Sequence, residues 1–113
     1  LLEAPAGTRE PGEDPEVTAR RELQEEVGFR AGKITSIGGS WVAPGYSTEY
    51  SYMYIATDLE PAPLPSDDGE DIVVEEIEFG DLHRLISSGE LEDQMSIAAL
   101  LSAQHVYTEH IKD

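Results

Sequence analysis

The sequence predicts an α/β domain, because segments with helical and strand patterns alternate along it. Three observations support this fold class: a helix with clear start and stop residues, strand-like runs rich in tyrosine, isoleucine and valine, and two further helices after them. At 113 residues the chain is long enough for one domain with one core, so residues 1–113 form a single predicted domain. The expected elements are helices at 15–27, 81–88 and 93–110, and strands at 33–38, 50–58 and 72–79.

The first helix has its boundaries marked by local residues. Leu1 and Leu2 look like the end of a strand and lead through a turn and a loop to Asp14, the predicted N-cap. Pro15 follows at the first helical position, where its missing N–H is tolerated. Gly28 is the predicted C-cap, because glycine adopts a left-handed backbone at little cost. The predicted buried stripe of this helix consists of Ala19, Leu23 and Val27.

Strands and later helices follow from composition and from capping residues. The loop at 43–49 separates the first two strands, and residues 60–71, with three prolines and a run of acids, are predicted to form a long exposed loop. Gly89 closes the second helix, and Asp93 starts the third. The apolar side of the third helix is expected to hold Met95, Ala98, Ala99, Leu101 and Val106.

The charge balance excludes some partners. The chain has 24 acidic and 7 basic side chains and a formal net charge of −17. The negative electrostatic field of such a chain repels polyanions, so binding to nucleic acid or to an anionic membrane is not expected. An anionic substrate would need a local divalent cation to offset the repulsion. The chain has no cysteine, no apolar run that could span a bilayer and no leader-like start, which favours a cytoplasmic location.

Three glutamates of the first helix lie within five residues. Glu22 and Glu26 are one turn apart and Glu25 lies beside them, so their carboxylates share an arc of about 100°. Glu26 also falls near the apolar stripe, where partial burial is expected. Arg21 can pair with Glu25, and Mg²⁺ is the natural partner for the remaining charge. A solvated acidic helix face is the alternative, and the E-x-x-E-E spacing alone favours that alternative.

Flanking residues complete a longer pattern. Gly7 is followed after five residues by Glu13, and after seven more come Arg21-Glu22-Leu23, Glu25-Glu26 and Gly28-Phe29. This stretch, 7–29, resembles the Nudix box of the Nudix hydrolase family at every specified position. Pro44 lies 16 residues after Gly28, which is similar to the mark of the ADP-ribose pyrophosphatase branch.

The resemblance implies a Nudix fold, a mixed β-sheet sandwiched between α-helices with the box helix laid against the sheet. It implies Mg²⁺-dependent hydrolysis, with Mn²⁺ as a substitute, of the diphosphate in a nucleoside diphosphate linked to another group. ADP-ribose, cleaved to AMP and ribose 5-phosphate, is the expected substrate. Family members carry a substantial segment before the box, and most of it is expected to be missing here; in the full-length protein it would support a homodimer.

Site residues also follow from the resemblance. Glu22 and Glu26 match the principal metal ligands, Glu25 a third ligand or a supporting acid, and the backbone carbonyl of Ala6 a main-chain ligand. Arg21 matches the residue that orients the glutamates by salt bridges. Glu13 matches a further box acid, with a structural role, and Gly7 matches a tight loop approach.

The remaining roles are less tightly specified by the pattern. A general base is expected in the loop at 66–71, where Asp68 and Glu70 are the alternatives and Glu70 is favoured for its reach. Residues that match the substrate side are Arg9, Pro44, Tyr46 and Glu49. Three of them have a structural alternative: Arg9 could pair with nearby acids, Tyr46, like Trp41, could be a core residue, and Glu49 could be an exposed strand-end acid.

Two alternatives to ADP-ribose hydrolysis stay open at this point. One is a Nudix hydrolase for another nucleotide sugar, a dinucleoside polyphosphate or an oxidised nucleotide, which Pro44 disfavours. The other is a non-catalytic Nudix-like module that binds a nucleotide or a protein. Loss of a box glutamate would be its usual sign, and the box keeps all of them.

Overall fold

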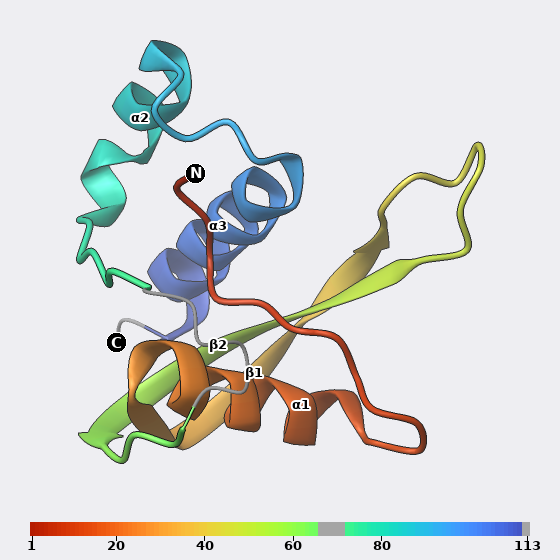
Figure 1. Cartoon of the computed structure of the whole chain (residues 1–113). Coiled ribbons are helices and arrows are strands. Elements are labelled where there is room, and N and C mark those ends of the chain that lie inside the picture. The colour runs from red at the N-terminus through yellow and green to blue at the C-terminus, as the bar shows by residue number, and fades with distance from the viewer. Residues whose placement is uncertain (66–71, 112–113) are drawn as a thin grey trace. The chain divides into compact units, whose positions relative to one another are not determined.

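The computed structural model of the chain describes residues 1–65 and 72–111 (Figure 1). It contains two compact units, each built from segments distant in sequence. The first unit comprises Leu1–Ala4, Ser36–Met53 and Glu76–Asp113, and the second comprises Pro5–Thr35 and Tyr54–Glu75. Within the described ranges, no helix combines the length and the apolar character needed to cross a membrane.

The second unit holds the box helix, which begins and ends as predicted. Helix α1 (Pro15–Glu22) continues into a π-helical turn, η1 (Leu23–Val27). The Asp14 side chain accepts a hydrogen bond from the Glu16 amide at 2.9 Å and caps the first turn. Gly28 ends the helix with φ 84°, in the left-handed region where glycine has no Cβ penalty.

The buried side of this helix differs from the predicted stripe. Ala19, Leu23 and Val27 are only half-buried, and Thr18 is the buried residue of α1. The Thr18 hydroxyl donates to Glu13 Oε1 at 2.7 Å, so the loop before the helix covers this side. The predicted stripe is therefore only partly covered, and the buried residue of α1 is a polar one that bonds to the preceding loop.

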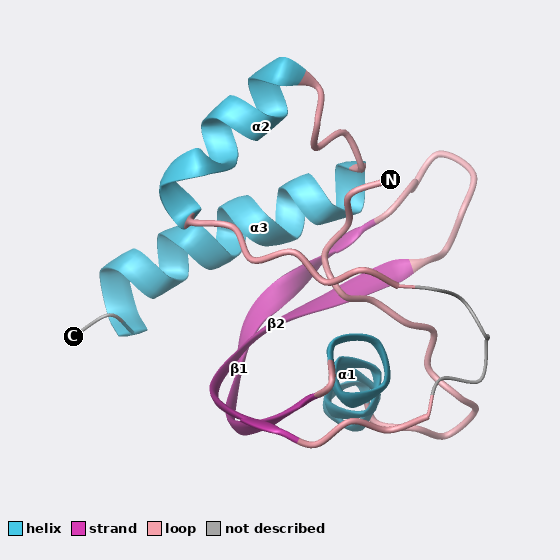
Figure 2. Ribbon diagram, turned by 60° about the vertical axis from the view of Figure 1, so that its left-hand side comes forward, coloured by secondary structure: helices cyan, strands magenta, loops and turns pink. Residues whose placement is uncertain are grey.

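Two long strands form an antiparallel hairpin (Figure 2). Strand β1 (Phe29–Trp41) and strand β2 (Tyr50–Pro61) both extend beyond the predicted ranges and run through both compact units. Among the described residues the sheet has these two strands. Its connecting loop is a turn in which the Ser47 amide donates to the Ala43 carbonyl at 2.8 Å.

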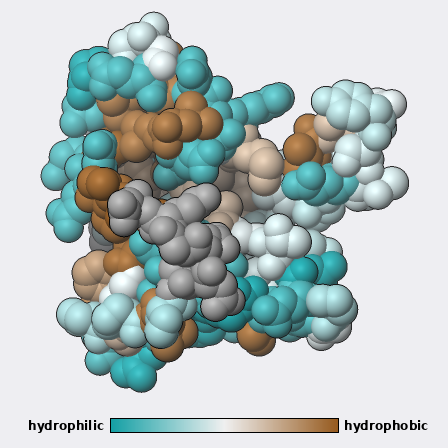
Figure 3. Space-filling view, in the orientation of Figure 1, coloured by the Kyte–Doolittle hydropathy of each residue, from teal (hydrophilic) through white to brown (hydrophobic). Residues whose placement is uncertain are grey.

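The first unit packs its helices around a small leucine core. Helices α2 (Leu82–Ser88) and α3 (Gln94–Val106) lie at the predicted positions; the 3₁₀ turn η2 (Phe79–Asp81) precedes α2 and the π-helical turn η3 (Tyr107–Ile111) follows α3. Leu82, Leu85 and Leu91 form the buried cluster, and apolar side chains are visible among hydrophilic ones around α2 in Figure 3. As predicted, Asp93 caps α3 and Gly89 ends α2.

The predicted strand at 72–79 is wrong. Residues 72–78 have no regular secondary structure, and Val73 is 81% exposed. A strand needs a neighbour to bond its backbone groups, and in the described part of the chain β1 and β2 pair only with each other. For the same reason Leu1 and Leu2 are not part of a strand.

One residue of α3 is more exposed than its expected place suggests. Met95, expected on the apolar side of α3, is 37% exposed.

Candidate active site

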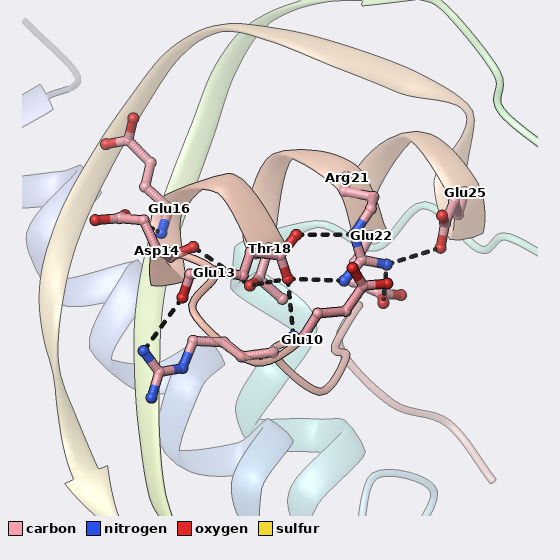
Figure 4. A network of polar contacts seen from close by, with 9 residues as sticks. Glu10, Glu13, Asp14, Glu16, Thr18, Arg21, Glu22 and Glu25 are labelled. Carbon is pink, nitrogen blue, oxygen red and sulfur yellow. Dashed lines mark hydrogen bonds and ion pairs between the residues drawn. The ribbon is translucent and has the colours of Figure 1, made fainter.

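One arginine gathers three of the box acids (Figure 4). The Arg21 guanidinium contacts Glu13 through two nitrogens, with Nε–Oε2 at 3.2 Å and Nη2–Oε1 at 3.0 Å. Its Nη1 donates to Glu22 Oε1 at 3.0 Å and to Glu25 Oε2 at 3.4 Å. The predicted pairing of Arg21 with Glu25 is confirmed, and Glu22 and Glu25 share one side of the helix as expected.

The cluster is largely shielded from solvent. The side chains of Arg21, Glu22 and Glu25 are 25, 18 and 17% exposed. Ion pairs between fully solvated side chains contribute little, because water and salt screen them. In this half-buried cluster the guanidinium instead offsets the repulsion between neighbouring carboxylates and restricts their orientations.

Glu13 holds the arginine in place. Besides its two bonds to Arg21, the Glu13 carboxylate accepts hydrogen bonds from the Thr18 hydroxyl and, at 3.1 Å, from the Glu10 amide. The bond from Arg21, helped by those from Glu10 and Thr18, lowers the pKa of Glu13 to about 2. Glu13 in turn raises the pKa of Arg21. These contacts agree with the structural role expected for Glu13.

This pairing leads to a pH-dependent stability. Because the folded-state pKa of Glu13 lies below its ordinary value of 4.5, its stabilisation is complete above about pH 4.5 and is lost as the pH falls towards 2. The difference in unfolding free energy between the natural chain and Glu13→Gln should therefore shrink across this window. Chemical denaturation of both proteins at several pH values measures it. A difference that stays constant down to pH 2 would contradict the assignment.

A backbone loop lies directly against Glu22. A Cβ atom placed on Gly7 would overlap the Glu22 carboxyl group, so any larger residue would require the Glu22 side chain or the loop to move. The tight loop approach predicted for Gly7 is thereby confirmed. Ala6 immediately precedes Gly7, so the same loop carries the carbonyl that was predicted to be a main-chain metal ligand.

Glu26 lies on η1 beside Glu25. The residue is half-buried and its Oε1 atom is screened from solvent, which confirms the partial burial expected from its position. A carboxylate in such surroundings is costly unless positive charge or hydrogen bonds compensate it.

The donor chemistry fits a hard divalent cation. Glu22, Glu25 and Glu26 supply only carboxylate oxygens, the ligand type that Mg²⁺ prefers, and all three project from adjacent turns of one helix. Within residues 1–65 and 72–111, no three acids or histidines converge on a single point as a ready-made metal cluster. Arg21 binds Glu22 and Glu25 instead, so the metal ligands stay a prediction.

The other predicted residues fall in three places. Arg9 lies in the loop before the box helix, where its Nη1 donates to the Glu13 carbonyl at 3.3 Å. Asp68 and Glu70, the alternative general bases, lie outside the described residues. The substrate-side residues Pro44 and Glu49 belong to the first compact unit, whereas the glutamate cluster belongs to the second.

Aromatic residues near the hairpin loop are not core residues. Tyr46 is 91% exposed and Trp41 is 59% exposed, so the core alternative for both is wrong. Trp41 packs edge-on against Tyr50 with ring centroids 5.0 Å apart. Glu49 is exposed, and its amide donates to Ser47 Oγ at 3.0 Å. Roles for Tyr46 and Glu49 in substrate binding stay predictions.

Two features of the site were not predicted from the sequence. Gln24 fills an unspecified box position, but its side chain bonds to the segment after β2 through the Ala62 carbonyl at 2.9 Å. The segment 61–65 is exposed as predicted, apart from the half-buried Ala62, but the amides of Ala62 and Leu64 also hydrogen-bond to the end of the box helix. The alternation of proline at 61, 63 and 65, which leaves an N–H only on Ala62 and Leu64, is the sequence signal from which a docked segment could have been inferred.

Comparison with known proteins identifies the class to which this fold and acidic cluster belong. The chain belongs to the NUDIX domain family, which it matches over residues 1–100. A solved structure described as an ADP compounds hydrolase superposes with a TM-score of 0.80 at 25% identity, covering 93% of this chain and 57% of that one. The predicted α/β Nudix fold is confirmed.

Particular relatives are pyrophosphatases. The chain is 36% identical over 102 residues to the ADP-ribose pyrophosphatase of Bacillus subtilis (strain 168), covering 88% of this chain and 55% of that protein. It is 35% identical over 103 residues to the GDP-mannose pyrophosphatase of Enterobacter sp. (strain 638), covering 88% and 53%. The chain thus spans about half the length of these curated relatives.

Proposed function

We propose that this chain carries the catalytic acids of a divalent-cation-dependent pyrophosphohydrolase. Its substrate is a nucleoside diphosphate linked to another group, and ADP-ribose is the substrate we favour. The cluster of Glu22 and Glu25 around Arg21, at the spacing of a complete Nudix box, is the observation that carries this proposal. The ADP-ribose pyrophosphatase relative supports the choice of substrate.

In this proposal Glu22, Glu25, Glu26 and the Ala6 carbonyl hold Mg²⁺, for which Mn²⁺ can substitute. A bound divalent cation neutralises diphosphate charge and lowers the pKa of a coordinated water. Arg21 keeps the glutamate side chains on one side of the helix. Glu13 fixes Arg21 from the loop, so that the guanidinium does not have to be ordered when substrate arrives.

Proton removal and substrate binding are assigned by the sequence pattern. Asp68 or Glu70 would act as the general base for the attacking water, with Glu70 favoured for its reach. Arg9, whose guanidinium lies in the loop beside Glu13, would meet a substrate phosphate. The exposed Tyr46 ring could stack on a nucleobase, and Pro44 and Glu49 lie in the same loop region.

GDP-mannose is the second candidate substrate, because a GDP-mannose pyrophosphatase matches the chain nearly as well. Pro44 favours ADP-ribose instead. The intact set of box glutamates disfavours a non-catalytic nucleotide-binding module. For the full-length protein we expect a homodimer, and the lack of cysteine favours a cytoplasmic location.

A substrate panel tests the proposal. The chain is incubated with Mg²⁺ and ADP-ribose, GDP-mannose or a dinucleoside polyphosphate, and the products are separated by chromatography. We expect AMP and ribose 5-phosphate from ADP-ribose, and no reaction when the cation is chelated. Preferential cleavage of GDP-mannose would support the second substrate. Nucleotide binding without hydrolysis of any compound would instead support a non-catalytic module.

A further inference from the structure

A short proline-spaced segment docks on the end of the box helix. We call residues 61–65, Pro-Ala-Pro-Leu-Pro, the strap. Proline has no backbone N–H, so Ala62 and Leu64 carry the strap's two donors. Ala62 N donates to Gly28 O at 3.0 Å, and Leu64 N donates to Gln24 O at 3.2 Å. Both backbone donors of the strap therefore point at the helical turn that carries the acids.

The π-helical turn supplies the acceptor for the second of these bonds. In a regular α-helix the Gly28 N–H would bond to the Gln24 carbonyl, four residues back. Here Gly28 N donates to Leu23 O, five residues back, at 3.0 Å. The Gln24 carbonyl is thereby released for Leu64 of the strap. Single π-helical turns of this kind are frequent at functional sites.

The Gln24 side chain completes the attachment. Its Nε2 donates to the Ala62 carbonyl at 2.9 Å, and the side chain is part-buried. The backbone of Ala62 is thus bonded on both sides, through its N–H to Gly28 and through its C=O to Gln24. Gln24 directly precedes Glu25 and Glu26, so any rotation of this turn would also move the two carboxylates.

We propose that Gln24 is a positioning residue, which acts with the strap to hold the π-helical turn so that Glu25 and Glu26 can bind a divalent cation. This inference rests on the proposed function. Loss of the Nε2 donor would leave the Ala62 carbonyl without its side-chain partner and free the turn to return to α-helical register. Partners that orient metal ligands typically matter by about 10–100-fold in metal affinity or activity.

The test compares Gln24→Met with Gln104→Met. Methionine has nearly the length of glutamine but lacks the amide donor. Gln104 is the matched control because it makes the same kind of bond, from Nε2 to the Phe79 carbonyl at 3.1 Å, in the other compact unit. Mg²⁺ binding is measured by titration calorimetry without substrate, kcat and KM for ADP-ribose are measured with Mg²⁺, and unfolding is followed in parallel.

We expect Gln24→Met to weaken Mg²⁺ binding about tenfold and to lower kcat with little change in KM, whereas Gln104→Met leaves all three unchanged. If Gln24→Met does not fold, Leu64→Pro is used instead. It removes the hydrogen bond from the Leu64 amide to the Gln24 carbonyl and should weaken Mg²⁺ binding and lower kcat in the same way. If the variant folds and its Mg²⁺ binding and kcat are unchanged, this inference is overturned while the proposed function stands. A natural chain that neither binds Mg²⁺ nor hydrolyses ADP-ribose would overturn the proposed function, and this inference with it.

Discussion

Replacing Glu26 by glutamine is expected to lower kcat/KM for ADP-ribose by about 10²–10³-fold, comparable to the loss of one group that stabilises transition-state charge. Glutamine keeps the shape of the side chain but removes the negative charge that a hard cation requires. Glu26 is half-buried on the π-helical turn, so an acid on the exposed surface does not readily take the place of its carboxylate as a ligand. Steady-state kinetics with Mg²⁺, together with calorimetric titration of Mg²⁺, measures the effect.

Glu16→Gln is the control for this substitution. Glu16 lies on the same helix, but it is exposed and pairs with Arg20 at 3.4 Å on the surface. The Glu16→Gln substitution should therefore change kcat/KM by less than about twofold, since exposed ion pairs of this kind contribute little. Equal losses in both variants would show that general changes in charge matter, and that Glu26 has no special role.

Gly7→Ala should produce the second large effect, a loss of kcat/KM of about 10²-fold. The added Cβ would overlap the Glu22 carboxyl group, so the carboxylate or the loop that carries Ala6 must move. Displacements near 1 Å in a catalytic arrangement are sufficient for losses of this size. Kinetics at increasing Mg²⁺ concentration would show the displacement as a higher requirement for the cation.

Gly80→Ala is the matched control, because a Cβ on Gly80 meets nothing within 4 Å. This variant should keep the activity and the Mg²⁺ requirement of the natural chain. Unchanged kinetics in Gly7→Ala would mean that the position of Glu22 is not needed for the reaction, and would count against Glu22 as a metal ligand.

The box helix could be predicted because its signals are local. Asp14 and Pro15 start the helix and Gly28 ends it through interactions that span one turn. The common side shared by Glu22 and Glu25 follows from the helical repeat. Helices α2 and α3 were predictable for the same reason, since Gly89 and Asp93 mark their ends.

Other features depend on partners that lie elsewhere in the chain. The run at 72–79 has the composition of a strand, yet no strand forms, because composition cannot supply a hydrogen-bonding neighbour. Glu13 lies in the loop before the helix and reaches Arg21 only when that loop folds back along α1, and Gly7 meets Glu22 only after the same loop approaches the helix.

By itself, the sequence determined that three glutamates lie close together on the box helix and that Glu22 and Glu25 share one side of it. The tertiary structure decided how these acids are held: by Arg21, by the loop at Gly7 and by the strap that binds Gln24. The physical reason is one of range. Capping and helical periodicity act within a few residues, whereas the π-helical turn and the arginine network need hydrogen-bond partners that only the folded chain brings into contact.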